Sequence, residues 1–445
     1  MRVVSLLPYS VGNLSEEIHQ CLFSCLFLSN TDTYYALPYY FLNSSFLQYK
    51  SCNYGLFLLV DYINYYNLGF AKANIFKFLY SFYFIFSRIL YLVMRYIFCK
   101  FHVSKSIVDN FKFWFSFPRL GYSSLWDCGY VQHSDEYIRK KLDESPIDSI
   151  LSASLECLMS DAKSFIDNYL FDQFKDIGNP VIVLHTRSSF YHSDGNRRNR
   201  NMSLVNYLSS IQFLIDQGFC VVLCGDRHNL ILPAGVIDLT RDDIPAKTRE
   251  LLLVLYISKA FLYIGTQSGP VDLAYLFTIP CLLLNCIDVT HVYAYRSPNI
   301  NIIKPIKPNI SLVQWIDLMP YDILQNLNSI ADSTVYGSYN DFELDPELIY
   351  SVISSIVTPN NKQNSLFNSK ISDQKVLAGD RFFHLDRKLI SDKFFELVRT
   401  WDSQINAMPG YKRILQTYMN RAVVRFYFTM AFDSSSWYLP LSKVD

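Results

Sequence analysis

Glycine is scarce in this chain, since only 15 of the 445 residues are Gly, roughly half the usual share. Two of them, Gly265 and Gly269, stand four positions apart in FLYIGTQSGPVDLAYLF (Phe261 to Phe277). This stretch opens with an apolar run typical of a buried strand and continues with an apolar periodicity typical of a helix. Glycine at such a junction indicates a sharp turn or a close approach to the backbone.

An excess of charge of one sign is also lacking. Forty basic and forty acidic residues cancel, so no global field gathers nucleic acid and any anion site must be local. The ten cysteines include no C-x-x-C pair, and no His stands at metal-ligand spacing from the closest pairs. These pairs are Cys21/Cys25, Cys220/Cys224 and Cys281/Cys286. We therefore expect free thiols, no metal site and a cytoplasmic location.

Several well-known motifs are missing. The sequence has no G-K-[ST] phosphate loop and no G-x-G-x-x-G dinucleotide fingerprint. It also lacks the G-x-S-x-G nucleophile elbow of many hydrolases. A signal peptide does not fit the first residues, because the apolar run Val3–Leu7 is short and ends at Pro8. We expect that run to be the first β-strand.

The chain is too long for one hydrophobic core, which predicts two domains with appendages. Residues 1–145 mix strand-like and helical runs and predict an α/β lobe, with further strands at Tyr34–Leu37 and Gly55–Val60. Residues 146–176 have helical periodicity and predict a linker helix. We expect residues 311–445 to form a helical extension containing LDPELIYSVISSI and DKFFELVRTWDSQINAM.

Residues 177–310 alternate between fully apolar runs and amphipathic ones. VIVLH, FCVVLCG, FLYIG and PCLLLN are expected strands, and the segments between them have helical periodicity. Strands that are apolar on both faces, alternating with helices, are typical of a parallel sheet covered on both sides. The sequence thus predicts a doubly wound α/β domain here.

The most apolar segment is FKFLYSFYFIFSRILYLVMRYIFCKF, Phe76 to Phe101, within an expected helical insert at about 70–101. On a helix, Lys77, Ser81, Arg88 and Arg95 fall within about 40° of one another, opposite an aromatic face. Two central arginines disfavour a membrane span. Three alternatives remain open: a helix lying in a membrane interface, a core or oligomer-interface helix, and a spanning helix.

Basic and imidazole groups follow the expected strand Val181–Leu184. His185 and Arg187 alternate out of its end, and a polar loop follows with His192, Arg197, Arg198 and Arg200. Ligands of open α/β sheets bind beyond the carboxyl ends of the strands, and Arg suits bidentate phosphate contacts. A solvated surface loop is the alternative, mainly for Arg197 and Arg198.

Two other strand ends carry candidate residues. Gly225 permits a tight turn. Asp226 can accept a hydrogen bond from a ribose or cap a helix. In the stretch Phe261 to Phe277, Gly265 allows a turn and Gly269 leaves the backbone accessible. Thr266 and Ser268 provide hydroxyl groups between them. Pro270 favours the first turn of a helix, whose N-terminal N–H groups attract phosphate. A plain turn and an ordinary helix N-cap are the alternatives.

At these residues the chain resembles bacterial two-domain GT-B glycosyltransferases of surface-polysaccharide (O-antigen and capsule) assembly. The similar elements are VGNLSEEI, LHTRSSFY, the run from NRNMSLVNYL to VVLCGD, LLLVLYISKAFLYIGTQSGPVDLAYLFTIPCLLLN and LDPELI. The block from about 180 to 310 also looks like the donor half of fucosyltransferase-like enzymes. The chain departs from the family at Asn13, where His is more familiar, and at Ser188-Ser189, where an acidic residue is expected after the Arg.

The resemblance implies a GT-B fold, two Rossmann-like lobes facing a cleft, that transfers sugar from a nucleotide-diphosphate donor to a lipid-linked surface polysaccharide. It implies donor contacts from His185, Arg187, Thr266 and Ser268, supported by Tyr191, Arg200 and Asn201. It places Gly12, Asn13 and Glu17 on the acceptor side, and Glu17 is our candidate general base. Arg187 would offset charge on the leaving diphosphate.

The expected partners are a GDP- or UDP-linked sugar, the lipid-linked saccharide acceptor and a membrane surface, without nucleic acid. No cofactor or metal is expected, and the location is the cytoplasm or the inner face of a bacterial inner membrane. The main alternative is a non-catalytic transferase-like scaffold of a polysaccharide assembly complex. An RNA-binding protein is disfavoured by the neutral charge balance.

Overall fold

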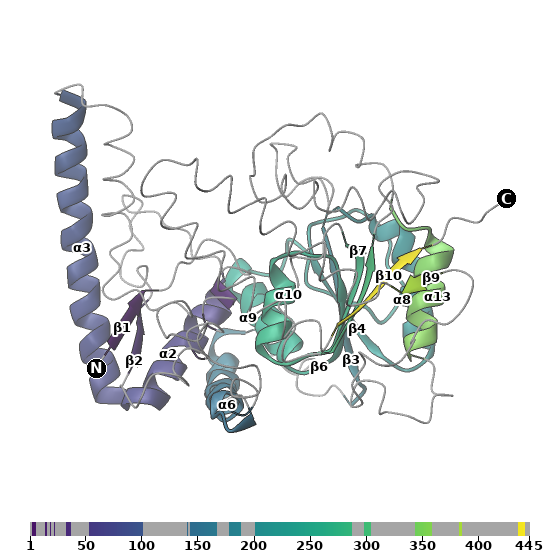
Figure 1. Ribbon diagram of the computed structural model, residues 1–445, viewed down its shortest axis with the longest axis horizontal. Helices are drawn as coiled ribbons and strands as arrows, with labels where there is room; N and C mark the ends of the chain where they lie inside the picture. Colours follow the sequence, from purple (N-terminus) through teal and green to yellow (C-terminus); the bar gives the residue numbers. More distant parts are fainter. Residues whose placement is uncertain are drawn as a thin grey trace. The chain divides into compact units, whose positions relative to one another are not determined.

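The computed structural model divides the chain into two compact units, an N-terminal unit, Met1–Asp167, and a C-terminal unit, Asn168–Asp445 (Figure 1). Each unit is described by itself. The residues that the structure describes are 2–5, 14–15, 18, 22, 33–36, 53–100, 140, 143–166, 178–187, 201–286, 298–303, 343–357, 382–384 and 435–440.

The N-terminal unit contains two short parallel strands, β1 (Arg2–Ser5) and β2 (Thr33–Ala36), as the sequence predicts. Helix α2 (Tyr54–Leu68) packs against β2. The Asn64 side chain of α2 accepts from the Tyr35 N–H (2.7 Å) and donates to the Tyr35 carbonyl (2.8 Å). These two bonds pair the backbone N–H and carbonyl of Tyr35 and fix the strand to the helix.

The prediction of a strand at Gly55–Val60 is wrong, because these residues form the first half of α2. Asn53 caps the helix by accepting from the Leu56 N–H at 2.9 Å, and Gly69, at φ 75°, ends it. The run is buried throughout, since α2 packs against β2, α3 and α6. A continuous apolar run does not distinguish a buried helix from a buried strand.

Helices α3 (Phe70–Lys100) and α6 (Ile147–Phe165) complete the described part of this unit. They confirm the helical predictions for the aromatic segment and for the described part of 146–176. The first turns of α3 pack on β2 and α2 through a small cluster of Tyr34, Leu68, Ala73 and Tyr80. Among the described residues, no helix combines the length and the apolar character needed to cross a bilayer.

The C-terminal unit is built on an eight-stranded sheet with the order β5-β4-β3-β6-β7-β8-β10-β9. All its neighbouring strands are parallel except β10 and β9. The strands are β3 (Val181–Thr186), β4 (Cys220–Gly225), β5 (Ile237–Asp238), β6 (Ala260–Gly265), β7 (Cys281–Cys286), β8 (Asn299–Ile303), β9 (Phe382–His384) and β10 (Ser435–Pro440).

Helices cover both faces of this sheet (Figure 1). On one face, the 3-10 helix η3 (Leu204–Tyr207), α8 (Leu208–Asp216) and α13 (Pro346–Val357) pack on alternate residues of the central strands, such as Leu184 and Ile264. On the other face, α9 (Ala246–Ser258) contacts β3 and β6, and α10 (Gly269–Leu276) contacts β6. The predicted doubly wound α/β class is confirmed, and the unit is consistent with a Rossmann-like fold.

The C-terminal region contributes to the same sheet. Strand β10 pairs with β8 in parallel, and β9 pairs with β10 in the antiparallel direction. The expectation of a purely helical extension over 311–445 therefore needs correction, although α13 confirms the helix expected in LDPELIYSVISSI. The helix expected at DKFFELVRTWDSQINAM lies outside the described residues.

Candidate functional site

The strand order places a topological switch point between β3 and β6. From β3 the chain winds outward through β4 to β5, then returns to the other side of β3 and continues through β6 to β8. The connections that follow these two parallel strands run in opposite directions. A crevice therefore forms at the carboxyl ends of the strands, where ligands of such sheets bind. His185 is the second-last residue of β3 and Gly265 is the last of β6, so the candidate residues lie at this crevice.

A hydrogen bond crosses the switch point. The Ser268 hydroxyl lies 3.1 Å from His185 Nδ1. His185 is buried, and its ring stacks on Tyr263 with centroids 6.4 Å apart. Burial, with a further contribution from the Arg187 charge, lowers the His185 pKa from 6.5 to about 3. The imidazole is therefore neutral at physiological pH and acts by hydrogen bonding.

Arg187 follows β3 directly and is buried, with 6% of its surface exposed. Its charge acts on His185, so the guanidinium lies within electrostatic range of the imidazole. The Met202 N–H donates to the Arg187 carbonyl at 2.8 Å. This bond holds the chain next to the end of β3, so that Asn201, the neighbour of Met202, lies near this strand end.

Gly225 and Asp226, at the end of β4, also meet the end of β3. Gly225 has φ 118°, and a Cβ there would lie 1.8 Å from the Thr186 carbonyl oxygen. The Asp226 N–H donates to that oxygen at 3.2 Å. No other residue fits at position 225 without moving backbone, which explains one of the few glycines and brings β4 into the same edge.

The turn after β6 has the predicted parts. Ser268 is the N-cap residue of α10, with Pro270 in the first turn. Its side chain forms no capping bond to that turn, because the hydroxyl faces His185 and the Thr266 carbonyl (3.4 Å). Gly265 is needed for a packing reason, since a Cβ there would lie 2.9 Å from the ring of Tyr263.

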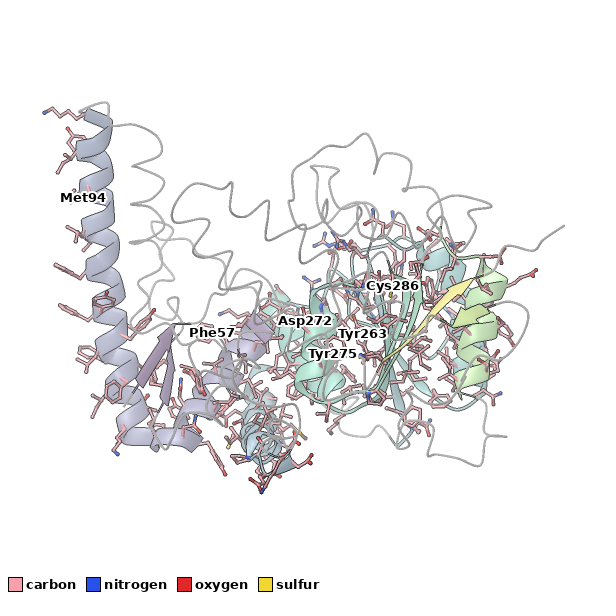
Figure 2. The ribbon with its side chains drawn as sticks, in the orientation of Figure 1. Phe57, Met94, Tyr263, Asp272, Tyr275 and Cys286 are labelled. Carbon is pink, nitrogen blue, oxygen red and sulfur yellow. The ribbon has the colours of Figure 1, made fainter. Side chains whose placement is uncertain are left out.

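A buried polar layer beneath α10 was not anticipated from the sequence. Tyr263, Cys281 and Asn299 are register neighbours on β6, β7 and β8, and their alternate neighbours point to the α8/α13 face. Burial above all, with a contribution from the Asp272 charge, raises the pKa of the Tyr263 and Tyr275 hydroxyls. Figure 2 labels Asp272 and Tyr275 on α10 and Tyr263 on the underlying sheet.

Several atoms of this layer have unused hydrogen-bonding capacity. In the part of the chain that the structure describes, Thr266 Oγ1, the Tyr275 hydroxyl and both amide atoms of Asn299 have no hydrogen-bond partner. Thr266 and Asn299 are fully buried. Buried polar atoms of native proteins bond to protein, ordered water or ligand, so each of these atoms has room in its hydrogen bonding for such a partner. The missed signal is NINII, with polar residues on one face of a buried strand.

The carboxyl end of β7 is tied to the start of α13. Asn285, at φ 55°, accepts from the Leu344 N–H (2.8 Å) and donates to the Tyr207 hydroxyl (3.2 Å). Glu343 accepts from the Ser203 N–H (2.7 Å) and the Asn206 amide (2.9 Å), at the start of η3. These bonds fix segment 343–345 at the edge of the sheet where the site lies.

The structure thus brings together seven predicted donor-side residues at the ends of β3, β4 and β6, with Asn201 beside them and Gly269 beginning α10. The seven are His185, Arg187, Gly225, Asp226, Gly265, Thr266 and Ser268. The other predicted site residues lie outside the described residues. They are Gly12, Asn13, Glu17, Tyr191 and Arg200, together with the loop residues His192, Arg197 and Arg198.

No protein-family model matches the chain, and no curated protein sequence matches it. A functional proposal therefore depends on the geometry of the site.

Proposed function

We propose that the chain is a glycosyltransferase of GT-B type, which uses a nucleotide-diphosphate sugar and extends a lipid-linked surface polysaccharide. The observation that carries the proposal is the contact of 3.1 Å between Ser268 and His185 across the switch point. It joins a strand end that carries a buried guanidinium to a turn that opens a helix. Both are groups that bind phosphate oxygens.

The diphosphate of the donor would lie over this contact. Arg187 would pair with its oxygens, and the first N–H groups of α10 would donate to them. Asp272 lies in the first turn of α10, and its charge acts on Tyr263, Tyr275 and Cys281 in the layer beneath the helix.

The neutral imidazole of His185 supplies one further donor in either tautomer. If Ser268 donates to Nδ1, the proton on Nε2 is available to a ligand oxygen. If Nδ1 carries the proton and donates to Ser268, the hydroxyl hydrogen of Ser268 is available instead. In both cases one hydrogen remains for a phosphate oxygen without adding a charge to the buried site.

In the reaction, the bond between the anomeric carbon and the diphosphate breaks and the acceptor hydroxyl forms the new glycosidic bond. Arg187 would stabilise the negative charge that develops on the leaving diphosphate. A base must remove the acceptor proton, and Glu17 in the N-terminal unit stays the candidate, with Gly12 and Asn13 beside it in sequence. The two compact units of the chain accord with the two lobes of a GT-B enzyme.

The test begins with a thermal-shift screen of the full chain against UDP, GDP, CMP and dTDP conjugates. A nucleotide that binds only the native state at 100 times its Kd stabilises the protein by about 2.7 kcal/mol, so a responder identifies the donor class. Turnover of the responding donor, measured as release of its nucleoside diphosphate, then distinguishes an enzyme from a scaffold. A scaffold would bind the donor without consuming it.

Arg187→Ala should lower kcat/KM by roughly 30- to 900-fold, equivalent to about 2–4 kcal/mol of transition-state stabilisation. Arg227→Ala is the matched control, since Arg227 follows the next strand, β4, and its side chain is 70% exposed. Arg187→Lys keeps the positive charge but cannot make the bidentate contact. A folded Arg187→Lys protein with reduced turnover therefore reports loss of that contact rather than loss of folding. Unchanged turnover in a folded Arg187→Ala protein would refute the role of Arg187.

A further inference from the structure

Helix α3 carries an exposed apolar face along most of its length. Phe78, Phe82, Phe86, Ile89, Val93 and Tyr96 recur at intervals of three or four residues and are 49–69% exposed. At 100° per residue they fall within about 80° of one another on the helix circumference. Figure 2 shows side chains projecting from α3 along the helix. We call these six residues the apolar stripe of α3.

The first turns of α3 pack on their own unit through Ala73 and Tyr80, with Phe76 beside them. Lys77 lies there and pairs with Asp61 of α2 at 2.7 Å, with both side chains only 15% exposed. By helical position, Arg88 and Arg95 share the side of Lys77. Helices on soluble proteins normally bury the apolar side and expose the charged one. An exposed apolar stripe of this length indicates that something apolar covers it.

The charges of the helix indicate which apolar partner fits. The helix Phe70–Lys100 contains no Asp or Glu. Lys72 and Lys100, near its two ends, are exposed. A second copy packed on this stripe would bring lysines near lysines in either orientation, with no acidic residue on the helix to pair with them. Anionic lipid headgroups complement such a helix.

The length of the helix indicates its orientation. At 1.5 Å per residue its 31 residues extend about 46 Å, well beyond the roughly 30 Å of a bilayer core. Apolar side chains along one side over this length suit a helix that lies parallel to the membrane plane. We propose that α3 inserts its apolar stripe into the interface of an anionic lipid bilayer and lies flat on it.

This proposal does not depend on the proposed function, because it concerns other residues and is tested with lipid rather than nucleotide. Vesicle binding without nucleotide binding would leave it standing while the glycosyltransferase proposal failed. Nucleotide binding without vesicle binding would refute the membrane proposal and leave the glycosyltransferase proposal standing.

The first experiment is flotation of the full chain with vesicles of phosphatidylcholine, alone and with about 30% phosphatidylglycerol, an anionic lipid. We expect strong flotation with the anionic vesicles and weaker flotation with phosphatidylcholine alone or in high salt. The variant Phe78→Ser/Phe82→Ser/Phe86→Ser should lower the partition coefficient roughly 100-fold or more, because three aromatic side chains no longer enter lipid. Val205→Ser/Ile231→Ser, which changes exposed apolar residues of the C-terminal unit, should float like the unmodified chain.

The second experiment keeps the proposal testable if the triple variant does not fold. Phe82→Trp places a reporter on the stripe, and Ile231→Trp places one at a residue that is 94% exposed in the C-terminal unit. Bromine-labelled anionic lipid should quench the added fluorescence of Phe82→Trp and leave that of Ile231→Trp unchanged. Quenching by bromines near the headgroup rather than at the bilayer centre would confirm the flat orientation.

Three results would overturn the proposal. One is the absence of flotation with anionic vesicles, and another is equal flotation of the chain and a folded triple variant. The third is a dimer, seen by light scattering without lipid, that the triple substitution dissociates while the unmodified chain does not bind vesicles. That result would assign the stripe to a second copy.

Discussion

Replacement of His185 by Asn is a direct test of the buried, neutral imidazole at the centre of the site. The Asn side chain can still hydrogen-bond to Ser268, which lies 3.1 Å from His185 Nδ1, but it does not titrate. Burial, assisted by the Arg187 charge, holds the folded-state pKa of His185 at about 3, against 6.5 for an ordinary His. The unfolded chain therefore binds a proton at His185 in a pH range where the folded chain does not.

The sign and size of the effect follow from this difference in proton binding. Because the folded pKa is lowered, the contribution of His185 to stability is fully present above pH 6.5 and is lost as the pH falls toward about 3. Well inside this window, each pH unit removes about 1.4 kcal/mol from the free energy of unfolding. Between pH 6.5 and about 5 the loss from this residue alone is roughly 1.6 kcal/mol.

Two assays measure this effect. In denaturant titrations of both proteins from about pH 5 to pH 7.5, the free energy of unfolding of His185→Asn should depend less on pH. The difference between the two proteins should change by roughly 1.6 kcal/mol between pH 6.5 and about 5. In NMR spectra of the chain with labelled histidines, one of the eight His signals should stay at its neutral position over that range. That signal should be absent from the variant. Equal pH dependence of the two proteins, or a His185 signal that titrates near pH 6.5, would refute the reasoning.

Two further substitutions test the fold around the site and the helix. Gly225→Ala should lower the free energy of unfolding by more than about 3 kcal/mol, since its Cβ would overlap the Thr186 carbonyl. Gly178→Ala, with no atom within 4 Å of its Cβ, should change stability by less than about 0.5 kcal/mol in the same denaturation assay. Lys77→Met should cost about 3 kcal/mol at neutral pH by leaving Asp61 without its partner. Since burial raises the Asp61 pKa, the cost should shrink as the pH is lowered, and a constant cost would contradict that assignment.

The C-terminal unit could largely be predicted because its strands are apolar on both faces and short helical periods separate them. This pattern determines a parallel sheet with helices on each face. It also predicts that the strand ends share one edge, so His185 and Ser268 could be expected near each other. Their hydrogen bond was not predictable, because it depends on which strands are neighbours. The strand order that places β6 beside β3 is a tertiary property.

The N-terminal unit shows the limit of a local pattern. Residues Gly55–Val60 are apolar without interruption, and only the packing of α2 on three neighbours makes them a helix. A local signal was available in Asn53, which accepts from the Leu56 N–H and so marks a helix start. Strand β10 was missed for a different reason, because its pairing with β8 joins segments more than a hundred residues apart.

Hydrogen-deuterium exchange of the full chain, with and without saturating GDP or UDP, tests the central claim most directly. We expect slower exchange in peptides that cover residues 185–187 and 266–272 when the correct nucleoside diphosphate is bound. Both regions should respond together, since in the proposed binding mode one diphosphate contacts both Arg187 and the start of α10. Exchange that is unchanged in both regions at millimolar GDP and UDP, or protection confined to other segments, would contradict the account.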